Sequence, residues 1–412
     1  MIDIRLLKEN KEFYSTSFKN KGFDLDKEIE KVIKLYSEYL TLLQEEEKAR
    51  IELKEVSSKI KKDPSLKSEA QKISTRAKEL TTKVNELDAE IKTIASYFPN
   101  PSFDYVPIGK SEEDNKVIST HMDDKKENPF SKPHWEIIKE NKYVLIDEAA
   151  NISGTRHVVY NGKAAEVIKA LEKLMIENAK EDGHMLIEAP VLVNEEAMFN
   201  TGQLPKFGDD AYKVGDQYLI PTSEVSVTNL SANKIYDAKQ LPIKYVSASN
   251  CFRKEAGAAG KDTRGIIRLH QFRKVELIKF GKQEDLDLDF NSMLKTATNV
   301  LDKLELPYKL LQLCTGDASF TAAKTIDIEV WMPGVNTYRE ISSISTCTDF
   351  QSRRLKARYK DNKGKKKLIY TYNGSGLAIE RTFAAIVENY IQKNGKVKVP
   401  LALKPYLDFK EF

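Results

Sequence analysis

One stretch of the chain carries arginine, glutamate and aromatic residues whose types and spacing could bind a nucleotide. Arg253 and Glu255 stand two residues apart, and a loop rich in glycine and arginine leads from them to Arg268 and Phe272. On a β-strand, residues two apart point to one face, so we expect Arg253 and Glu255 to face a common ligand. Arginine matches phosphate oxygens, a carboxylate accepts from an amino group, and an aromatic ring stacks on a base. A salt-bridged surface hairpin is the alternative interpretation.

A second cluster, from Arg339 to Arg353, contains oxygen ligands suited to a metal ion that arrives with a nucleotide. Glu340 and Ser343 would offer a carboxylate and a hydroxyl, the hard donors that Mg²⁺ takes when phosphates and water complete its shell. A polar edge strand would carry the same residues.

Two shorter clusters add groups for phosphate and for an ammonium ion. Asn373 to Thr382 places glycines before a helix that carries Arg381 in its first turns, so backbone could approach a ligand there. The same pattern is also common as a purely structural turn. In the segment Pro221 to Val225, a hydroxyl and a carboxylate could hold an ammonium group.

Two long helices are predicted ahead of these clusters, between about residues 26 and 98. Over 65–98, apolar or small residues recur every three or four positions, which is the pattern of a coiled coil. The seam positions are Ala70, Ile73, Ala77, Leu80, Val84, Leu87, Ile91, Ile94 and Phe98. The same spacing runs over 29–60, although polar residues interrupt it towards the end, namely Glu46, Arg50 and Ser57.

The two helices are expected to form an antiparallel hairpin that projects as an arm. Asp63-Pro64-Ser65 separates them, and proline breaks a helix while serine can cap the next one. A second helix of about 32 residues, rising about 1.5 Å per residue, would reach roughly 48 Å. Its basic distal half suits contact with a phosphate backbone, and the basic residues are Lys48, Arg50, Lys54, Lys59, Lys61, Lys62, Lys67, Lys72, Arg76 and Lys78. A dimerising or spacer coil would show the same heptads.

The remaining segments predict a mostly antiparallel sheet. Residues 99–128 are polar and without periodicity, so a connector is expected there, and residues 166–178 have the pattern of an amphipathic helix. Short segments rich in Ile, Val, Tyr and Phe follow, with few intervening helices. They span 218–220, 243–246, 275–280, 326–331 and 368–372.

Composition bounds the class of protein. A chain of 412 residues favours two domains. Its 66 Lys and Arg nearly balance 62 Asp and Glu, for a net charge of +4, so a polyanion must be met by local basic surface. The N-terminus MIDIRLLKEN lacks an apolar leader core, and no run of about 18 apolar residues occurs, so we expect a soluble, cytoplasmic protein without a membrane partner. Three distant cysteines and five scattered histidines predict reduced thiols and no zinc site.

Taken in order, the clusters closely resemble those of the seryl-tRNA synthetases, class II aminoacyl-tRNA synthetases, in their bacterial form. FRKEAGAAGKDTRGIIRLHQFRKVE is similar to motif 2 of that family, and NGSGLAIERT to its motif 3. PTSEV resembles the serine-binding TxE element, and REISSISTCTDFQSRR the strand that precedes motif 3. The resemblance covers nearly the whole chain. It implies an α+β protein with an N-terminal tRNA-binding domain at 1–101, whose arm spans about 26–98, and a catalytic domain at 102–412 built on an antiparallel β-sheet flanked by helices.

The resemblance also implies which side chains meet each ligand. It gives the catalytic contacts to Arg253, on the ATP α-phosphate, and to Arg381, on the γ-phosphate. The ATP-binding set that it implies is Arg253, Lys254, Glu255, Arg268, Phe272, Glu340, Ile341, Ser342, Ser343 and Arg381. The serine-binding set is Thr222, Ser223, Glu224, Glu276 and Ser375. Glu340 and Ser343 would hold Mg²⁺ together with ATP.

Some positions depart from the family pattern. Ser223 and Ser226 stand where Ala and Pro are usual, and Lys254, Ile344 and Glu380 also differ from the common residues. None of these changes removes a group with a named chemical role. We expect Lys254 to point away from the nucleotide if the strand alternates. The segment around Pro190 resembles motif 1, which lies at the dimer interface in class II synthetases, but only Pro190 matches it well. The expected homodimer therefore rests mainly on the resemblance of the whole chain.

The expected activity is the ATP-dependent conversion of L-serine to seryl-adenylate, followed by transfer to the 3′ end of serine tRNA. The sequence leaves open whether selenocysteine tRNA is also charged. Attack by a serine carboxylate needs no general base, so alignment and charge neutralisation should suffice. Two other functions are less consistent with the sequence. A ligase relative that loads something other than tRNA would not need a basic arm, and a coiled-coil nucleic-acid binder would leave the arginine, glutamate and glycine clusters unused.

Overall fold

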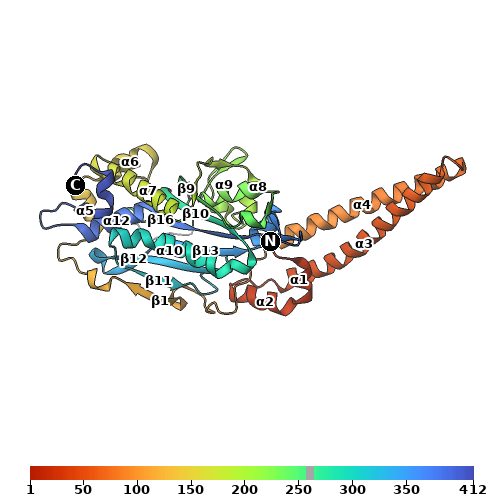
Figure 1. The fold of residues 1–412 in the computed structure, drawn as a ribbon, viewed down its shortest axis with the longest axis horizontal. Coiled ribbons are helices and arrows are strands. Elements are labelled where there is room, and N and C mark those ends of the chain that lie inside the picture. Colours follow the sequence, from red (N-terminus) through yellow and green to blue (C-terminus); the bar gives the residue numbers. More distant parts are fainter. Residues whose placement is uncertain (257–263) are drawn as a thin grey trace. The chain divides into compact units, whose positions relative to one another are not determined.

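The computed structural model describes residues 1–256 and 264–412, and the chain divides into two compact units, Met1–Pro101 and Ser102–Phe412 (Figure 1). Residues 257–263, which belong to the glycine-containing loop of the predicted nucleotide motif, lie outside the described residues.

The first unit is helical. Its helices are α1 (Ile4–Glu9), α2 (Lys11–Asn20), α3 (Asp26–Lys59) and α4 (Lys67–Ala95). Helices α3 and α4 pack along one another as a hairpin (Figure 1), because the apolar residues of α4 return to one face every three or four positions. The residues of α4 buried on this face include Ala70, Ile73, Ala77, Leu80, Val84 and Ile91. The predicted coiled-coil hairpin is confirmed.

Two details of the hairpin differ from the prediction. Asp63, not Ser65, caps the turn, since its carboxylate accepts from the Ser65 backbone N–H at 3.0 Å and from Ser65 Oγ at 2.6 Å. Glu46, expected to interrupt the seam, is buried. Its Oε1 accepts from Thr81 Oγ1 at 2.6 Å and lies 2.6 Å from Arg50 Nη2. A buried carboxylate with two such donors costs far less free energy than an unpaired one.

The second unit is built on an eight-stranded sheet with the order β1-β11-β12-β13-β16-β10-β9-β4. All neighbours in it are antiparallel except β4 and β9, which are parallel. The strands are β1 (Lys116–His121), β4 (Met185–Leu186), β9 (Ile243–Phe252), β10 (Gln271–Gly281), β11 (Tyr308–Gln312), β12 (Lys324–Met332), β13 (Thr337–Thr348) and β16 (Tyr370–Ala378). The predicted antiparallel sheet flanked by helices is confirmed.

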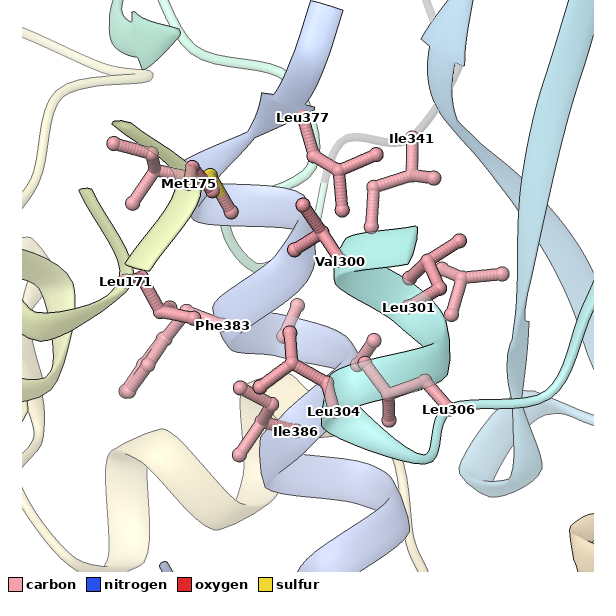
Figure 2. Packing of buried hydrophobic residues seen from close by; sticks show 14 of the residues in the cluster. Leu171, Met175, Val300, Leu301, Leu304, Leu306, Ile341, Leu377, Phe383 and Ile386 are labelled. Carbon is pink, nitrogen blue, oxygen red and sulfur yellow. The ribbon is translucent and has the colours of Figure 1, made fainter. Parts of the chain in front are cut away.

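One face of this sheet carries the main hydrophobic core. Three helices pack on it, α7 (Lys163–Glu181), α10 (Leu286–Leu304) and α12 (Ile379–Tyr390). Figure 2 shows Leu171 and Met175, Val300 and Leu304, and Phe383 and Ile386 of these helices gathered around Ile341 and Leu377 from the strands. The regular alternation of side chains along a strand is shifted at Ile341 in β13 and at Gly376 in β16, where the strand pairing is irregular. Ser343 and Ser375, beyond these shifts, line a polar cavity together with Glu276 of β10.

Smaller sheets and short helices complete the unit. The remaining strands are β2 (Val144–Leu145), β3 (Val159–Tyr160), β5 (Leu192–Val193), β6 (Lys213–Val214), β7 (Gln217–Leu219), β8 (Ile235–Asp237), β14 (Arg358–Lys360) and β15 (Lys366–Leu368). The remaining helices are α5 (His134–Glu140), α6 (Ile146–Ser153), α8 (Glu195–Asn200), α9 (Glu224–Thr228) and α11 (Phe350–Leu355). Among the described residues, no helix combines the length and apolar character needed to span a bilayer.

Sequence reasoning missed two elements of this unit. The 19-residue helix α10 was not expected, although Phe290, Met293, Ala297, Val300 and Leu304 form its buried stripe at helical spacing. Strand β1 lies in the segment expected to be a structureless connector. It is an edge strand with exposed Val117 and Ile118, so no buried face gave it the alternating pattern that marks a strand.

Candidate functional site

A cavity of about 460 Å³ lies beside β10, β13 and β16. Each strand contributes polar side chains at alternate positions: Lys274 and Glu276 from β10, Ser343 and Ser345 from β13, and Asn373 and Ser375 from β16. Residues just outside the strands complete the lining, including Thr222 and Glu224 at the start of α9, Arg253 and Glu255 after β9, and Arg381 in the first turn of α12. The sheet therefore gathers segments distant in sequence around one polar cavity.

Arginines and an aromatic ring form the part of the cavity suited to a nucleotide. The guanidinium carbon of Arg253 lies 5.3 Å from the centroid of the Phe272 ring. Arg268 Nη1 donates to Glu255 Oε2, and this ion pair holds Glu255 although its backbone has a φ of 52°. The sequence predicted that Arg253 and Glu255 face the same ligand because they alternate along a strand. That reason is wrong, because strand β9 ends at Phe252. A turn beyond the strand places both in the cavity.

Arg381 and Glu340 form a second charged pair in the cavity. Arg381 Nη1 lies 3.2 Å from Glu340 Oε2 and donates to the Glu340 backbone carbonyl at 2.7 Å, while its Nε donates to the Ile267 carbonyl at 3.2 Å. Partial desolvation would raise the pKa of Glu340, whose side chain is 48% exposed, but the nearby Arg381 guanidinium, with Arg253 and Lys274, holds that pKa below its ordinary value. Glu340 is thus kept ionised.

Oxygen donors near Glu340 fit a small, hard cation. The hydroxyl-bearing Ser343 lines the cavity, and Asp327 stands opposite it in the register between β12 and β13. Asp327 Oδ1 is buried without a hydrogen-bond partner among the described residues, and burial together with the Glu340 charge raises the Asp327 pKa. A divalent cation would offset this crowding of carboxylates. No group of three or more His, Cys, Asp or Glu side chains in the described chain could hold a metal on its own.

Two buried carboxylates define the other end of the cavity. Glu276 is fully buried, and neither of its carboxylate oxygens has a hydrogen-bond partner within residues 1–256 and 264–412, although Lys274 Nζ lies 2.6 Å from Oε2. Glu224 is buried as well, and burial and the Glu276 charge raise its pKa to about 7. Its oxygens accept from Gln351 Nε2 at 2.6 Å and from Asn373 Nδ2 at 3.1 Å. Such a pair suits a small ligand with an ammonium group and a hydroxyl.

Comparison with known proteins places this arrangement in a family. Residues 1–101 match the family described as "Seryl-tRNA synthetase N-terminal domain", and residues 209–390 match "tRNA synthetase class II core domain (G, H, P, S and T)". A serine–tRNA ligase of Mesoplasma florum is 41% identical to this chain over 424 aligned positions, and the alignment covers 100% of both chains. The chain belongs to the seryl-tRNA synthetase family.

Solved structures of seryl-tRNA synthetases agree with this membership. The crystal structure of seryl-tRNA synthetase from Pyrococcus horikoshii complexed with ATP has a TM-score of 0.91 at 32% identity, covering 100% of this chain and 99% of that one. The cytoplasmic serine–tRNA ligase from Naegleria fowleri in complex with AMP has a TM-score of 0.87 at 29% identity, covering 100% and 98%.

The structure brings most residues of the predicted seryl-tRNA synthetase site together. Those that line the cavity are Thr222, Glu224, Arg253, Glu255, Arg268, Phe272, Glu276, Glu340, Ile341, Ser343, Ser375 and Arg381. Ser223, Lys254 and Ser342 do not line it. Ser223 Oγ donates to the Ser247 carbonyl, Lys254 Nζ lies 5.8 Å from the Tyr212 ring centroid, and Ser342 Oγ donates to the Ser375 carbonyl at 2.5 Å.

Three residues of this region had been given no role from the sequence. Lys274 and Asn373 each precede a predicted serine-binding residue by two positions on a strand, so period-two spacing could have marked both. Gln351 belongs to a recognised motif, but its contact with Glu224 joins residues 127 positions apart. Only the tertiary fold reveals that contact.

Gly374, in the predicted phosphate turn, is needed for packing between strands. Gly374 lies within β16, where an added Cβ would stand 2.3 Å from Ile344 Cδ1 and 2.9 Å from the Ser343 carbonyl oxygen. The close approach that this glycine allows is therefore to β13, which supports the structural interpretation of this position.

Proposed function

We propose that this chain is a serine–tRNA ligase whose cavity binds ATP and L-serine side by side. Members of this family activate serine with ATP and charge tRNA, and the enzyme activity follows from the membership. In the first step, a carboxylate oxygen of serine forms a bond to the α-phosphorus, the bond from that phosphorus to the β-phosphate bridge breaks, and pyrophosphate leaves. In the second step, the 3′-terminal ribose hydroxyl of tRNA takes the seryl group and AMP leaves.

The observation that carries the proposal is the fully buried Glu276 carboxylate, which faces the cavity that contains Arg253 and Arg381. Lys274 lies 2.6 Å from its Oε2, but neither oxygen accepts a hydrogen bond in the described chain. A buried, unsatisfied carboxylate costs stability unless a ligand completes it. L-Serine offers both an ammonium group and a hydroxyl as donors. A pocket built around such donors disfavours alanine, because it would leave buried acceptors unpaired.

The remaining roles follow from charge and position. Arg253 and Arg381 would hold the triphosphate and offset the charge that develops during displacement. Phe272 would stack on the adenine, while Glu255, fixed by Arg268, would accept from its amino group. Thr222 and Ser375 would complete the serine pocket beside Glu224 and Glu276. The carboxylate of serine is already a nucleophile at neutral pH, so alignment replaces a general base.

Glu340 and Ser343 would hold a Mg²⁺ ion that enters with ATP. Their donor set fits such an ion, because Mg²⁺ prefers oxygen ligands and shares its shell with phosphates and water. When bound, the ion would neutralise phosphate charge.

The proposal extends to the rest of the chain. Residues 1–101 would bind serine tRNA through the basic half of the hairpin, and residues 102–412 would carry the chemistry. A cytoplasmic homodimer is part of this proposal, with the segment around Pro190 at the dimer interface. Selenocysteine tRNA is a second candidate substrate.

Serine-dependent exchange of pyrophosphate into ATP tests the first step, and charging of serine tRNA tests the second. We expect both activities, with alanine and threonine inactive at equal concentration. Exchange without charging of any tRNA would mean that the seryl group goes to another acceptor. The absence of serine-dependent exchange would refute the proposal.

A further inference from the structure

A buried glutamine that does not itself line the cavity donates a hydrogen bond to the Glu224 carboxylate. Gln351, in α11, is 1% exposed, and its Nε2 donates to Glu224 Oε1 at 2.6 Å. Among the described residues that line the cavity, Glu224 and Asn373 are present but Gln351 is not. Its contact with any ligand there would therefore be indirect.

Three hydrogen bonds hold this amide, and together they fix its orientation. Nε2 donates a second time, to the Thr201 carbonyl at 3.1 Å, and Oε1 accepts from Thr371 Oγ1 at 2.7 Å. Thr201 and Thr371 are both buried. Rotating the amide by 180° would set Oε1 against two acceptors, the Glu224 carboxylate and the Thr201 carbonyl. The N–H of Gln351 is thus locked toward Glu224.

An amide suits this position better than a charged side chain. A lysine or arginine here would neutralise Glu224 and weaken its attraction for an ammonium ion, while a carboxylate would repel it. A neutral N–H donor fixes one oxygen and leaves the negative charge available. Asn373 does the same for the other oxygen, at 3.1 Å.

We propose that Gln351, oriented by Thr201 and Thr371, is a positioning residue that aims the Glu224 carboxylate at the amino acid in the cavity. The inference rests on the proposed serine-binding role of Glu224. It adds a determinant of serine affinity outside the ligand-lining set. The Gln351 hydrogen bond also acts to lower the Glu224 pKa, against the burial that raises it.

The test compares Gln351→Met, which keeps size but removes the donor, with Gln312→Met as a matched control. Gln312 is another buried glutamine, and its Nε2 donates to the Leu313 and Thr325 carbonyls. In pyrophosphate exchange, Gln351→Met should raise the KM for serine about tenfold or more, while the KM for ATP changes less than twofold. The pH at which kcat/KM for serine falls should move upward. Gln312→Met should change neither quantity, whatever its effect on Tm.

Two variants of Thr371 separate positioning from mere packing. Thr371→Val removes the hydroxyl that donates a hydrogen bond to Gln351 Oε1 and should raise the KM for serine a few-fold. Thr371→Ser keeps a hydroxyl and should have a KM for serine close to that of the wild type. An unchanged serine KM and pH profile in Gln351→Met, with wild-type exchange intact, would overturn this inference and leave the proposed function standing. Equal increases in the KM values for serine and ATP would also overturn it. Wild-type protein without serine-dependent exchange would refute the proposed function and this inference together.

Discussion

Glu276 gives a sharp prediction at the scale of single residues, because its buried carboxylate is ion-paired with Lys274 but neither oxygen accepts a hydrogen bond in the described chain. Glu276→Ala should lower kcat/KM for serine by roughly 10–100-fold, the equivalent of about 1.5–3 kcal/mol for hydrogen bonds to a charged group. The KM for ATP should change little. Steady-state exchange with each substrate varied in turn measures both. Glu329→Ala is a matched control, because Glu329 pairs with Lys309 at 2.8 Å away from the cavity. Equal changes in the two KM values would contradict the role.

The raised pKa of Glu224, about 7, predicts a pH dependence. As pH falls through 7, Glu224 becomes protonated in the ligand-free enzyme. The neutral carboxyl group then attracts the ammonium group of serine less strongly than the carboxylate does. The value of kcat/KM for serine should therefore fall between pH 8 and pH 6, and Glu224→Gln should abolish this inflection. An unchanged value over that range in the wild type would argue against the assignment.

The same shift bears on the stability of the ligand-free protein. The folded-state pKa of Glu224 exceeds the ordinary value of 4.5, so the folded protein binds more protons than the unfolded chain between pH 4.5 and about 7. The contribution of Glu224 to the free energy of unfolding must then decrease as pH rises through that window. Buried Glu380, whose pKa is also raised to about 7, acts in the same direction.

Arg253 and Arg381 should be required for adenylate formation. Changing either arginine to alanine removes a cation that is proposed to contact the phosphates of ATP. We expect serine-dependent pyrophosphate exchange to fall by roughly 100-fold or more in each variant. Circular dichroism should show an intact fold in both variants. Exchange close to that of the wild type in both would refute the ATP assignment.

At the scale of elements, Gly374 is needed for the contact between β13 and β16. Gly374→Ala should destabilise the protein by about 2 kcal/mol or more, since its Cβ would meet Ile344 Cδ1 at 2.3 Å and backbone oxygen at 2.9 Å. Gly376→Ala is the matched control, because its Cβ would first meet the Leu277 side chain at 3.2 Å. Denaturant unfolding should show a smaller loss in Gly376→Ala. A Tm for Gly374→Ala equal to that of the wild type would refute this packing role.

The elements also show how far sequence reasoning reaches. The heptads of α4 identified a coiled coil, and short segments rich in Ile, Val, Tyr and Phe, such as 275–280 in β10 and 326–331 in β12, indicated an antiparallel sheet, because each pattern is local. The turn at Arg253 and the edge strand β1 were misjudged, since neither position repeats a pattern. The site residues were found mainly through family motifs. Their supports were not, because the contact from Gln351 to Glu224 depends on how distant elements meet.

For the whole molecule, the near balance of charge makes the distribution of basic residues informative. The chain carries a net charge of only +4, yet the distal part of the hairpin exposes cations on both helices. Its exposed basic residues are Lys48, Arg50, Lys54, Lys59, Lys61, Lys62, Lys67, Lys72, Arg76 and Lys78. A contact with the phosphate backbone would use these charges and would weaken linearly with salt on a log–log plot.

The last prediction separates the two units by function. A chain that begins at Ser102 lacks the first compact unit but keeps every residue that lines the cavity. It should therefore retain serine-dependent exchange, whereas charging of tRNA should fall steeply because the basic hairpin is gone. The milder variant Lys59→Ala/Lys61→Ala/Lys62→Ala, in the full chain, should raise the KM for tRNA and reduce the salt slope without altering exchange, which guards against a folding defect in the shortened chain. If the shortened enzyme charges tRNA as well as the intact one, the hairpin is only structural, and its proposed role in binding tRNA is wrong.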